Sequence, residues 1–272
     1  MERSISINGI QLAFTEKGDR ATTILLIHGH PFNRSMWRPQ IAFLCSRHRV
    51  IVPDLRGYGE SGIAPHANET RLEQFAADSL ALALMDSLEV EKFVLGGLSM
   101  GGQIVLEIYR QAPKRIQALL LADTFAGLDA PERKQVRFAT ADRLGREGMA
   151  PYANEELTKM ITPANAESQP HVAAHVMELM LATPPLGAAA ALRGRARRVD
   201  YLPLLEKISV PTLVLVGRYD FYTPVALSEQ LVQGIPLATL SVIEDAGHMP
   251  NLDQPEAFNS AVSSWLDGLW TT

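Results

Sequence analysis

The first candidate for chemistry in this chain is a serine within residues 97–101, which read Gly-Leu-Ser-Met-Gly. The segment follows an apolar run at residues 93–96 and precedes a helical pattern at residues 103–109. A serine at a sharp turn between a strand and a helix is held in a strained backbone conformation that presents its hydroxyl above the sheet. We therefore predict that Ser99 is a nucleophile; the alternative is a glycine-rich phosphate loop or a tight turn.

A serine hydroxyl is a weak nucleophile and needs a general base, which a carboxylate must orient. His248 is the candidate base because it follows the last apolar run and a glycine and precedes the final helical pattern; the alternative is a loop histidine without a role. Asp220 is the candidate carboxylate because it ends the apolar stretch at residues 213–220. Asp123 also ends a predicted strand and is the rival acid. The order Ser99, Asp220, His248 is a known chain order for such triads, and of the two acids we favour Asp220.

The negative charge that develops on a carbonyl oxygen during attack needs two preorganised hydrogen-bond donors. The backbone N–H of Met100, directly after the serine, is one candidate. The other is the N–H of His30, because Pro31 in the same His-Gly-His-Pro segment has no N–H to give. The imidazole of His30 either lines the pocket or lies at the surface, and the residues alone leave both open.

Composition excludes several classes of protein. The chain has 272 residues, a net charge of −5 and no long basic run, so we predict no nucleic-acid partner. Cys45 is the only cysteine, which rules out an intrachain disulfide. No apolar run approaches the roughly 20 residues of a membrane helix, and the start lacks the layout of a signal peptide. We therefore expect a soluble, cytoplasmic protein that does not bind a membrane.

Short apolar runs bounded by turn residues predict parallel strands that are buried on both faces. They are residues 23–27, 50–52, 93–95, 118–122, 212–216 and 237–243. Helical patterns lie between and after them, at residues 70–88, 100–111 and 255–269. Near the start, two alternating segments flank Asn8 and Gly9, a dipeptide that favours a two-residue hairpin turn. The pattern predicts an α/β fold: a mostly parallel, doubly wound sheet with an N-terminal antiparallel hairpin.

Residues 126–199 do not show this alternation of strands and helices, since they are helical, rich in alanine and charge, and interrupted by prolines. An insertion of this kind between two strands predicts a helical cap over the C-terminal edge of the sheet, where ligands bind in such folds. We therefore divide the chain into a core domain, residues 1–125 and 200–272, and a cap, residues 126–199.

Two groups of cap arginines leave alternatives open. They are Arg133, Arg137, Arg143 and Arg146, and then Arg193, Arg195, Arg197 and Arg198. The first group would suit an anionic substrate, but an ordinary polar helix face is the favoured interpretation. For the second, solvated charge and pairing with nearby acids are favoured over phosphate binding. His171 and His175 share a helix face but lack the glutamate and third ligand of the metallohydrolase pattern, so we predict no metal and no organic cofactor.

Several short motifs, taken in their order and spacing, make the chain resemble the α/β-hydrolase superfamily over nearly its full length. These motifs are residues 28–31, 54–61, 97–102, 217–220 and 247–248. Within the superfamily the chain is most similar to 3-oxoadipate enol-lactonases and small bacterial aryl esterases, some of which show perhydrolase activity. That closer similarity rests on the serine turn at residues 97–102, on the length of the cap and on residues 193–200.

The resemblance implies that Ser99, Asp220 and His248 form the triad and that His30 and Met100 form the oxyanion hole. It also implies a structural turn, without a catalytic role, at residues 54–61. His30 departs from the group, in which an aromatic or aliphatic residue is more common.

We therefore predict a serine hydrolase that cleaves a small carboxylic ester or lactone through an acyl-enzyme. One alternative keeps the triad but hydrolyses a carbon–carbon bond or acts as a lyase. Another is a ligand-binding protein on a hydrolase scaffold, because a fold alone does not fix function. Substrate identity and homo-oligomerisation stay open.

Overall fold

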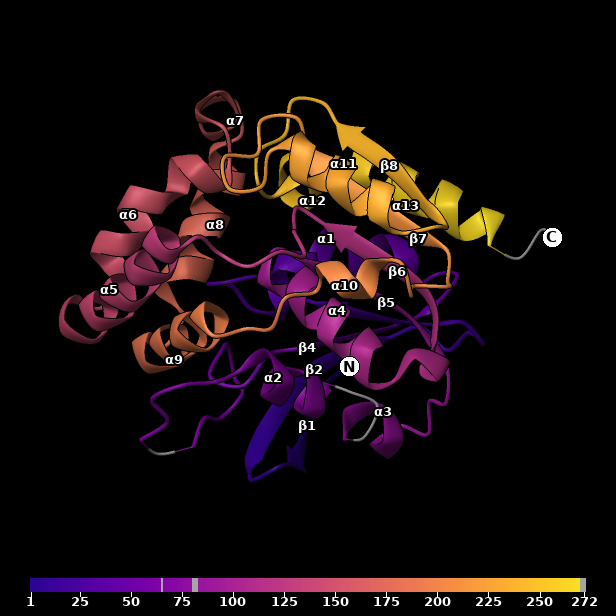
Figure 1. Cartoon of the computed structure of the whole chain (residues 1–272), viewed down its shortest axis with the longest axis horizontal. Coiled ribbons are helices and arrows are strands. Elements are labelled where there is room, and N and C mark those ends of the chain that lie inside the picture. The colour runs from indigo at the N-terminus through magenta and orange to yellow at the C-terminus, as the bar shows by residue number, and fades with distance from the viewer. Residues whose placement is uncertain (65, 80–82, 270–272) are drawn as a thin grey trace.

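A single eight-stranded sheet forms the centre of the molecule, in the order β1-β2-β4-β3-β5-β6-β7-β8 (Figure 1). The structure is a computed structural model that describes all residues except 65, 80–82 and 270–272. The strands are β1 Glu2–Ile7, β2 Ile10–Lys17, β3 Thr23–Ile27, β4 Arg49–Pro53, β5 Phe93–Leu98, β6 Ile116–Ala122, β7 Thr212–Gly217 and β8 Ala238–Ile243. The pairs β1–β2 and β2–β4 are antiparallel, and every other neighbouring pair is parallel.

The predicted hairpin and strands are present, but β8 is not buried on both faces as predicted, because it lies at the edge of the sheet and most of its residues are partly exposed. Asn8 and Gly9 adopt φ values of 45° and 78°, as a tight turn with two positive φ angles requires. Along β3, Leu25 and Ile27 belong to one hydrophobic core, whereas Ile24 and Leu26 belong to the other. Successive side chains of a strand point to opposite faces, so an uninterrupted apolar run lies between two cores.

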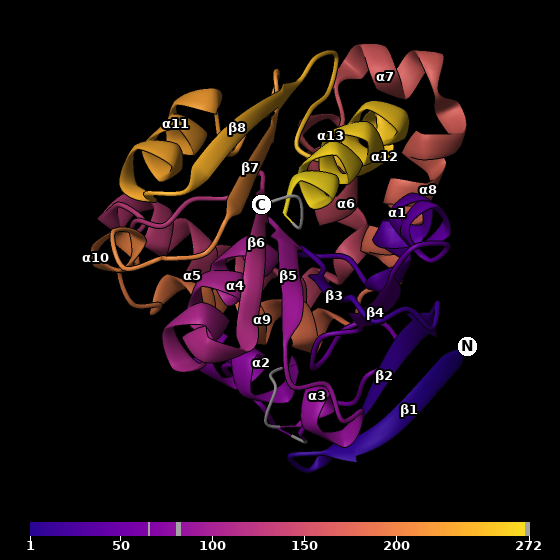
Figure 2. The same ribbon diagram turned by 90° about the vertical axis from the view of Figure 1, so that its right-hand side faces the viewer.

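Helices cover both faces of the sheet (Figure 2). Leu72 of α2 and Ile104 of α4 pack in one core, and Ile41 of α1 and Val262 of α13 pack in the other. These helices and their neighbours are α1 Arg38–Leu44, α2 Leu72–Ser79, α3 Leu84–Ser87, α4 Met100–Gln111, α10 Leu202–Leu205, α11 Val225–Gly234, α12 Pro250–Asp253 and α13 Pro255–Gly268, with 3₁₀ turns η1 Arg34–Trp37 and η2 Pro113–Arg115. The helix predicted at residues 70–88 corresponds to α2 and α3, and residues 80–82 of that prediction lie outside the described residues.

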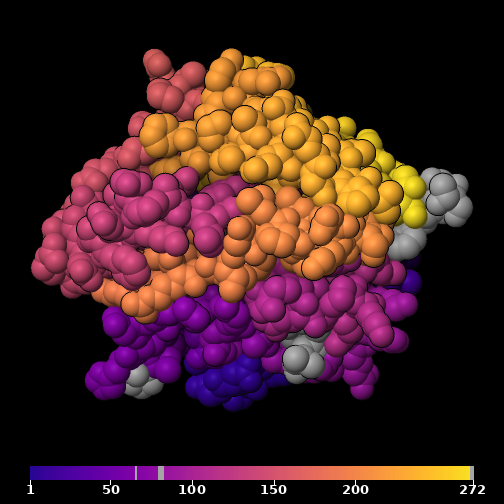
Figure 3. Space-filling model, in the orientation of Figure 1, coloured from indigo at the N-terminus to yellow at the C-terminus, as the bar shows by residue number. Residues whose placement is uncertain are grey.

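A helical insertion separates β6 from β7. It consists of α5 Pro131–Glu147, α6 Met149–Met160, α7 Pro163–Ser168, α8 Pro170–Leu181 and α9 Pro185–Ala196. Four of these helices begin at a proline, whose fixed φ and missing N–H suit the first helical position. The insertion forms one flank of the molecule (Figures 1 and 3). The domain boundaries at residues 125/126 and 199/200 stay a prediction.

No single helix of the described chain is both long and apolar enough to cross a membrane. Among the residues that the structure describes, one pair of helices, α8 and α9, meets that criterion of length and composition when taken together, and the two are bent by 86° relative to each other.

Candidate active site

Ser99 lies at the turn between β5 and α4. Its backbone has φ 57° and ψ −115°, a conformation that costs free energy in a residue with a Cβ. The Ser99 N–H donates to the carbonyl oxygen of Ala122 (2.9 Å), and the Thr124 hydroxyl donates to the carbonyl oxygen of Ser99 (2.7 Å). A Cβ at Gly101 would lie 2.3 Å from the carbonyl oxygen of Ile27. These contacts hold the serine in the strained turn, at the carboxyl end of the parallel strands.

Asp220 lies in the loop after β7, and its carboxylate is held by neighbouring donors. Oδ1 accepts hydrogen bonds from the backbone N–H groups of Tyr222 (2.7 Å) and Thr223 (3.0 Å), and Oδ2 accepts from the Thr223 hydroxyl. Burial alone would raise the pKa of Asp220, but the His248 ring and the Thr223 donors outweigh it and hold the pKa below its ordinary value. The carboxylate is therefore ionised at neutral pH. A hydroxyl residue shortly after an acid in a turn is a signal that could have identified Thr223.

His248 contacts this carboxylate directly. The distance from its Nδ1 to Oδ2 of Asp220 is 2.8 Å, so Nδ1 carries the proton and the lone pair of Nε2 is free. The two loops can approach because a Cβ at Gly217 would lie only 1.9 Å from the carbonyl oxygen of Gly247. The Tyr222 ring packs against the imidazole edge to face, with centroids 4.9 Å apart. The ring of His248 is thus fixed in both tautomer and orientation.

Ser99 and His248 line the same cavity, with a volume of about 240 Å³. Its walls also include His30, Phe125, Tyr152 and side chains of the insertion. Among the described residues the Ser99 hydroxyl makes no hydrogen bond. It is therefore free to rotate toward the imidazole, and such catalytic contacts are often loose without a substrate.

The two predicted oxyanion donors are both unengaged. Across the part of the chain that the structure describes, neither the N–H of His30 nor the N–H of Met100 has a hydrogen-bond partner. Met100 is the first residue of α4, where the first N–H groups have no partner within the helix. One of these free N–H groups directly follows Ser99 and the other belongs to a residue that lines the same cavity, and two such donors suit a negatively charged oxygen.

The structure decides the position of the His30 side chain, which the sequence left open. The ring is only 5% exposed and lines the cavity. Its Nδ1 is 2.7 Å from the Tyr58 hydroxyl, whereas Nε2 has no partner among the described residues. Burial, reinforced by the charges of Arg195 and Arg137, holds the pKa of His30 well below its ordinary value. The ring is therefore neutral at physiological pH.

The cap arginines differ in their environments. Arg133 and Arg137 line the cavity, whereas Arg143 lies outside it and pairs with Glu155. In the second group, Arg193 and Arg197 pair with acids at the surface, as expected. The prediction of solvated, paired charge is wrong for Arg195, which is buried in the cavity wall. Arg198 pairs with Asp129 as predicted, but it is buried rather than solvated. No sequence signal identified the position of Arg195, because α9 is buried on nearly all sides and shows no polar face.

Asp123, the rival acid, lies beside the proposed pair. One oxygen of Asp123, one of Asp220 and one ring nitrogen of His248 lie within 4.8 Å of one another. Burial, followed by the charge of Asp220, raises the pKa of Asp123 well above its ordinary value. Two ligands of one zinc ion stand about 3.4 Å apart in a tetrahedral site, so the 2.8 Å contact between Asp220 and His248 is that of a hydrogen bond. Of the two acids, it is Asp220 that contacts the imidazole.

Asp253 is a further acid near the histidine that the sequence did not identify. Its Oδ2 accepts the N–H of Gly247 (2.7 Å), and its Oδ1 is buried without a partner among the described residues. Burial raises the pKa of Asp253 to about 7. The carboxyl group fixes the loop before His248, and in the folded protein it keeps a proton that the unfolded chain would release near pH 4.

This difference predicts how stability depends on pH. Because the folded state binds the extra proton, the contribution of Asp253 to the free energy of unfolding is fully present below about pH 4 and is lost as the pH rises through about 7. Each pKa unit corresponds to about 1.4 kcal/mol, so we expect a loss of at most about 4 kcal/mol. Urea unfolding of wild type and Asp253→Asn from pH 4 to 8 measures it. Asp19→Asn, at an exposed position, is the control, and its free energy of unfolding should change with pH as that of wild type does. If the free energy of unfolding of Asp253→Asn also changed with pH as in wild type, the raised pKa of Asp253 would be contradicted.

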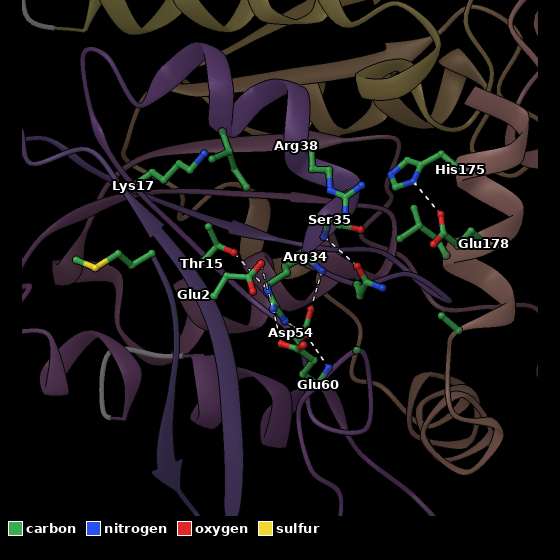
Figure 4. Close-up of a pocket in the computed structure, with 16 residues that line it drawn as sticks. Glu2, Thr15, Lys17, Arg34, Ser35, Arg38, Asp54, Glu60, His175 and Glu178 are labelled. Carbon is green, nitrogen blue, oxygen red and sulfur yellow. Dashed lines mark hydrogen bonds and ion pairs between the residues drawn. The ribbon is translucent and has the colours of Figure 1, made fainter. Parts of the chain in front are cut away.

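A second hollow, of about 540 Å³, lies between the N-terminal hairpin and α8 (Figure 4). At its centre, Arg34 pairs with Asp54 and Glu60, and Asp54 also accepts the N–H groups of Arg34 and Glu60. These bonds close the turn at residues 54–61, in agreement with its predicted structural role. Neither Ser99 nor His248 lines this hollow, so the smaller cavity is the candidate active site.

Residues 22–255 match the sequence model of a family described as the alpha/beta hydrolase fold. A 3-oxoadipate enol-lactonase of Acinetobacter baylyi is 32% identical over 234 residues, which are 85% of this chain and 84% of that protein.

Two solved structures are similar over nearly the whole chain. A thermophilic esterase from Thermogutta terrifontis, solved with malate bound, has a TM-score of 0.94 and 39% identity, with 100% of both chains covered. An enol-lactonase from Burkholderia xenovorans LB400 has a TM-score of 0.89 and 30% identity, with 97% of this chain and 100% of that chain covered.

Proposed function

Because this chain belongs to the α/β-hydrolase fold family, we propose that it is a serine hydrolase that cleaves a small carboxylic ester or lactone. The single observation that carries the proposal is the contact between Asp220 and His248 beside a cavity that Ser99 also lines. The similarity to enol-lactonases and esterases supports the choice of ester or lactone. The cavity of about 240 Å³ is below the usual range for drug-sized ligands, which favours a compact substrate.

In the proposed mechanism, Nε2 of His248 takes the hydroxyl proton of Ser99 as the oxygen attacks the substrate carbonyl. The N–H groups of His30 and Met100 hold the oxyanion. His248 then gives the proton to the leaving alcohol, and the acyl group stays on the serine. A water molecule, deprotonated by His248, attacks the acyl-enzyme and releases the acid. In a lactone the alcohol stays part of the acyl chain, so the second step releases a single product that carries both the acid and the alcohol.

Asp220 acts through the histidine rather than on the substrate. Its Oδ2 accepts the proton of Nδ1 at 2.8 Å, which keeps the lone pair on Nε2. Its negative charge also stabilises the imidazolium that forms when the serine gives up its proton.

A fluorophosphonate probe tests the proposal directly, because it reacts only with an activated serine. We expect one equivalent to be incorporated, with the modification located on Ser99 by peptide mass spectrometry. Prior incubation with a turned-over ester should slow the labelling. Absence of labelling at Ser99 would favour a ligand-binding protein on the hydrolase scaffold.

A further inference from the structure

We propose that Tyr222 is a positioning residue for the Asp220–His248 pair, and that Glu156 of the insertion holds it through its hydroxyl group. The inference rests on the proposed function, because the pair that Tyr222 positions is the one that activates Ser99. It gives the insertion a part in the reaction: helix α6 fixes the loop that carries the acid and, through the Tyr222 ring, the base.

Tyr222 contacts both members of the pair. Its backbone N–H donates to Oδ1 of Asp220 (2.7 Å), and its ring lies against the imidazole of His248, with ring centroids 4.9 Å apart. The other carboxylate oxygen, Oδ2, accepts the Nδ1 proton of His248 (2.8 Å). One residue therefore sets both the direction of the carboxylate and the plane of the imidazole, so a small displacement of Tyr222 would move Nε2 relative to the Ser99 hydroxyl.

The hydroxyl of Tyr222 reaches across to the insertion. It donates to Oε2 of Glu156 in α6, 66 residues earlier in the chain, while Oε1 of Glu156 accepts from Nζ of Lys159 (2.6 Å). The Glu156 side chain is only 14% exposed. A hydrogen bond to a charged group that is largely shielded from water is stronger than one between neutral groups. The contact with Glu156 is therefore suited to anchor the tyrosine ring.

The same helix also contacts the residue before Tyr222. Nζ of Lys159 lies 5.8 Å from the centroid of the Phe221 ring, within the range of a cation–π interaction. Phe221 is 64% exposed, and such interactions are weak at exposed positions. Helix α6 thus holds the two residues that follow Asp220, and the bond between Glu156 and Tyr222 is the stronger of the two contacts.

The insertion also holds the loop that carries His248. Nδ2 of Asn165 in α7 donates to the carbonyl oxygen of Asp245 (2.6 Å), and Nε2 of Gln169, which follows α7, donates to that of Asp253 (3.1 Å). Asp245 and Asp253 lie on either side of His248 in the chain. The acid loop and the histidine loop are therefore both tied to the insertion.

Two other roles for Tyr222 predict different results. Tyr222 lines the cavity, and a residue that only contacts the substrate would change KM without changing kcat. A residue that only joins the insertion to the core would change stability and neither kinetic constant. A positioning residue changes kcat and the rate at which Ser99 is acylated, because both depend on Nε2 being placed at the hydroxyl.

Tyr222→Phe tests the proposal, because it keeps the ring and the backbone N–H and removes only the hydroxyl. We expect kcat for p-nitrophenyl acetate to fall about 10-fold, since small misplacements in an active site cost up to about 100-fold, and KM to stay within about twofold. The rate constant for labelling of Ser99 by a fluorophosphonate should fall by a similar factor. The matched control is Tyr219→Phe in the same loop, at a position that is 62% exposed and does not line the cavity. Its kcat should stay within about twofold of wild type.

A double-mutant cycle tests the role of Glu156. Glu156→Ala should lower kcat as much as Tyr222→Phe does, and the double variant should lose no more than either single variant, because both changes remove one contact. Glu156→Gln, whose amide oxygen still accepts from the hydroxyl, should recover most of the kcat that Glu156→Ala loses. Losses that multiply in the double variant would show that the two residues act independently and would overturn the proposal.

The proton on Nδ1 of His248 gives a reading that needs no substrate. Because Asp220 holds this proton, it should give a sharp signal far downfield in the proton NMR spectrum of wild type and of Tyr219→Phe. The loss of the signal in Asp220→Asn assigns it. In Tyr222→Phe we expect the signal to broaden, because an imidazole that is less firmly held exchanges its proton with water faster.

The outcomes separate the two proposals. If wild type hydrolyses the ester and Tyr222→Phe lowers only the thermal unfolding midpoint or raises only KM, the positioning role is overturned and the hydrolase proposal stands. If wild type neither hydrolyses esters nor reacts with the probe, the hydrolase proposal fails. The NMR signal then decides the positioning of the pair, which a broadened signal in Tyr222→Phe supports and an unchanged signal overturns.

Discussion

Replacement of Ser99 by alanine is expected to lower kcat for a small ester such as p-nitrophenyl acetate by at least about 10⁴-fold. Loss of the nucleophile removes the covalent route, and the remaining triad members then contribute almost nothing, because such residues act as a unit. Steady-state kinetics over a panel of aryl esters and lactones measures the loss. The folded state should be nearly as stable as wild type, because the hydroxyl makes no hydrogen bond within the described residues.

Ser228→Ala is the matched control. Ser228 is also buried, its hydroxyl lacks a partner among the described residues, and it does not line the cavity. Its replacement should change kcat by less than about twofold. Equal rates for wild type and Ser99→Ala would mean that another group carries the hydrolysis, and a serine mechanism would have to be abandoned.

Asp220→Asn is expected to reduce kcat by about 10³- to 10⁴-fold, with little effect on folding. An amide at this position donates a proton to Nδ1 of His248 instead of accepting one, so the imidazole proton moves to Nε2. Nε2 then has no lone pair with which to take the hydroxyl proton of Ser99. Measurements of kcat from neutral to alkaline pH test this explanation. Hydroxide partly replaces the missing base at alkaline pH, so the difference in kcat between Asp220→Asn and wild type should become smaller there.

Asp123→Asn distinguishes the two acids. Burial raises the pKa of Asp123 well above its ordinary value and so favours the neutral side chain, for which an amide of the same shape is a close substitute. Its Oδ1 accepts the N–H of Gly217 at 2.9 Å, which an amide oxygen can also do. We expect a change of less than about tenfold. If Asp123→Asn lowered kcat as much as Asp220→Asn does, the assignment of the orienting role to Asp220 alone would be wrong.

Much of the fold could be predicted from local signals. The hairpin at Asn8 and Gly9 depends on two positive φ angles, which only a few residue types adopt easily. The central strands, such as β3, β5 and β7, were recognisable because both of their faces are buried, so nearly every side chain is apolar. Helix α4 was predicted with its observed bounds because the turn before it is specified by neighbouring residues.

The candidate site was only partly predictable. The residues proposed for the triad and the oxyanion hole could be selected because each ends or follows a predicted strand, and such ends meet at one edge of a parallel sheet. The choice between Asp123 and Asp220 needed coordinates, since both satisfy that rule. The hydrogen bond between Asp253 and Gly247 depends on the path of the loop around His248. The periodicity of apolar residues in the sequence does not predict the path of a loop.

The sequence by itself determined the order of strands and helices, the strained turn at Ser99 and the presence of a helical insertion, because these depend on neighbours within a few residues. Only the tertiary structure decided which charges lie in water and which face the cavity. Arg195 and Arg197 are two residues apart, yet one is buried beside Gln103 and the other pairs with Glu69 at the surface. That difference arises from the packing of α9 against α5 and against more distant parts of the chain, such as Gly57 and Thr70. The solvation of a charge follows from such packing rather than from its local sequence.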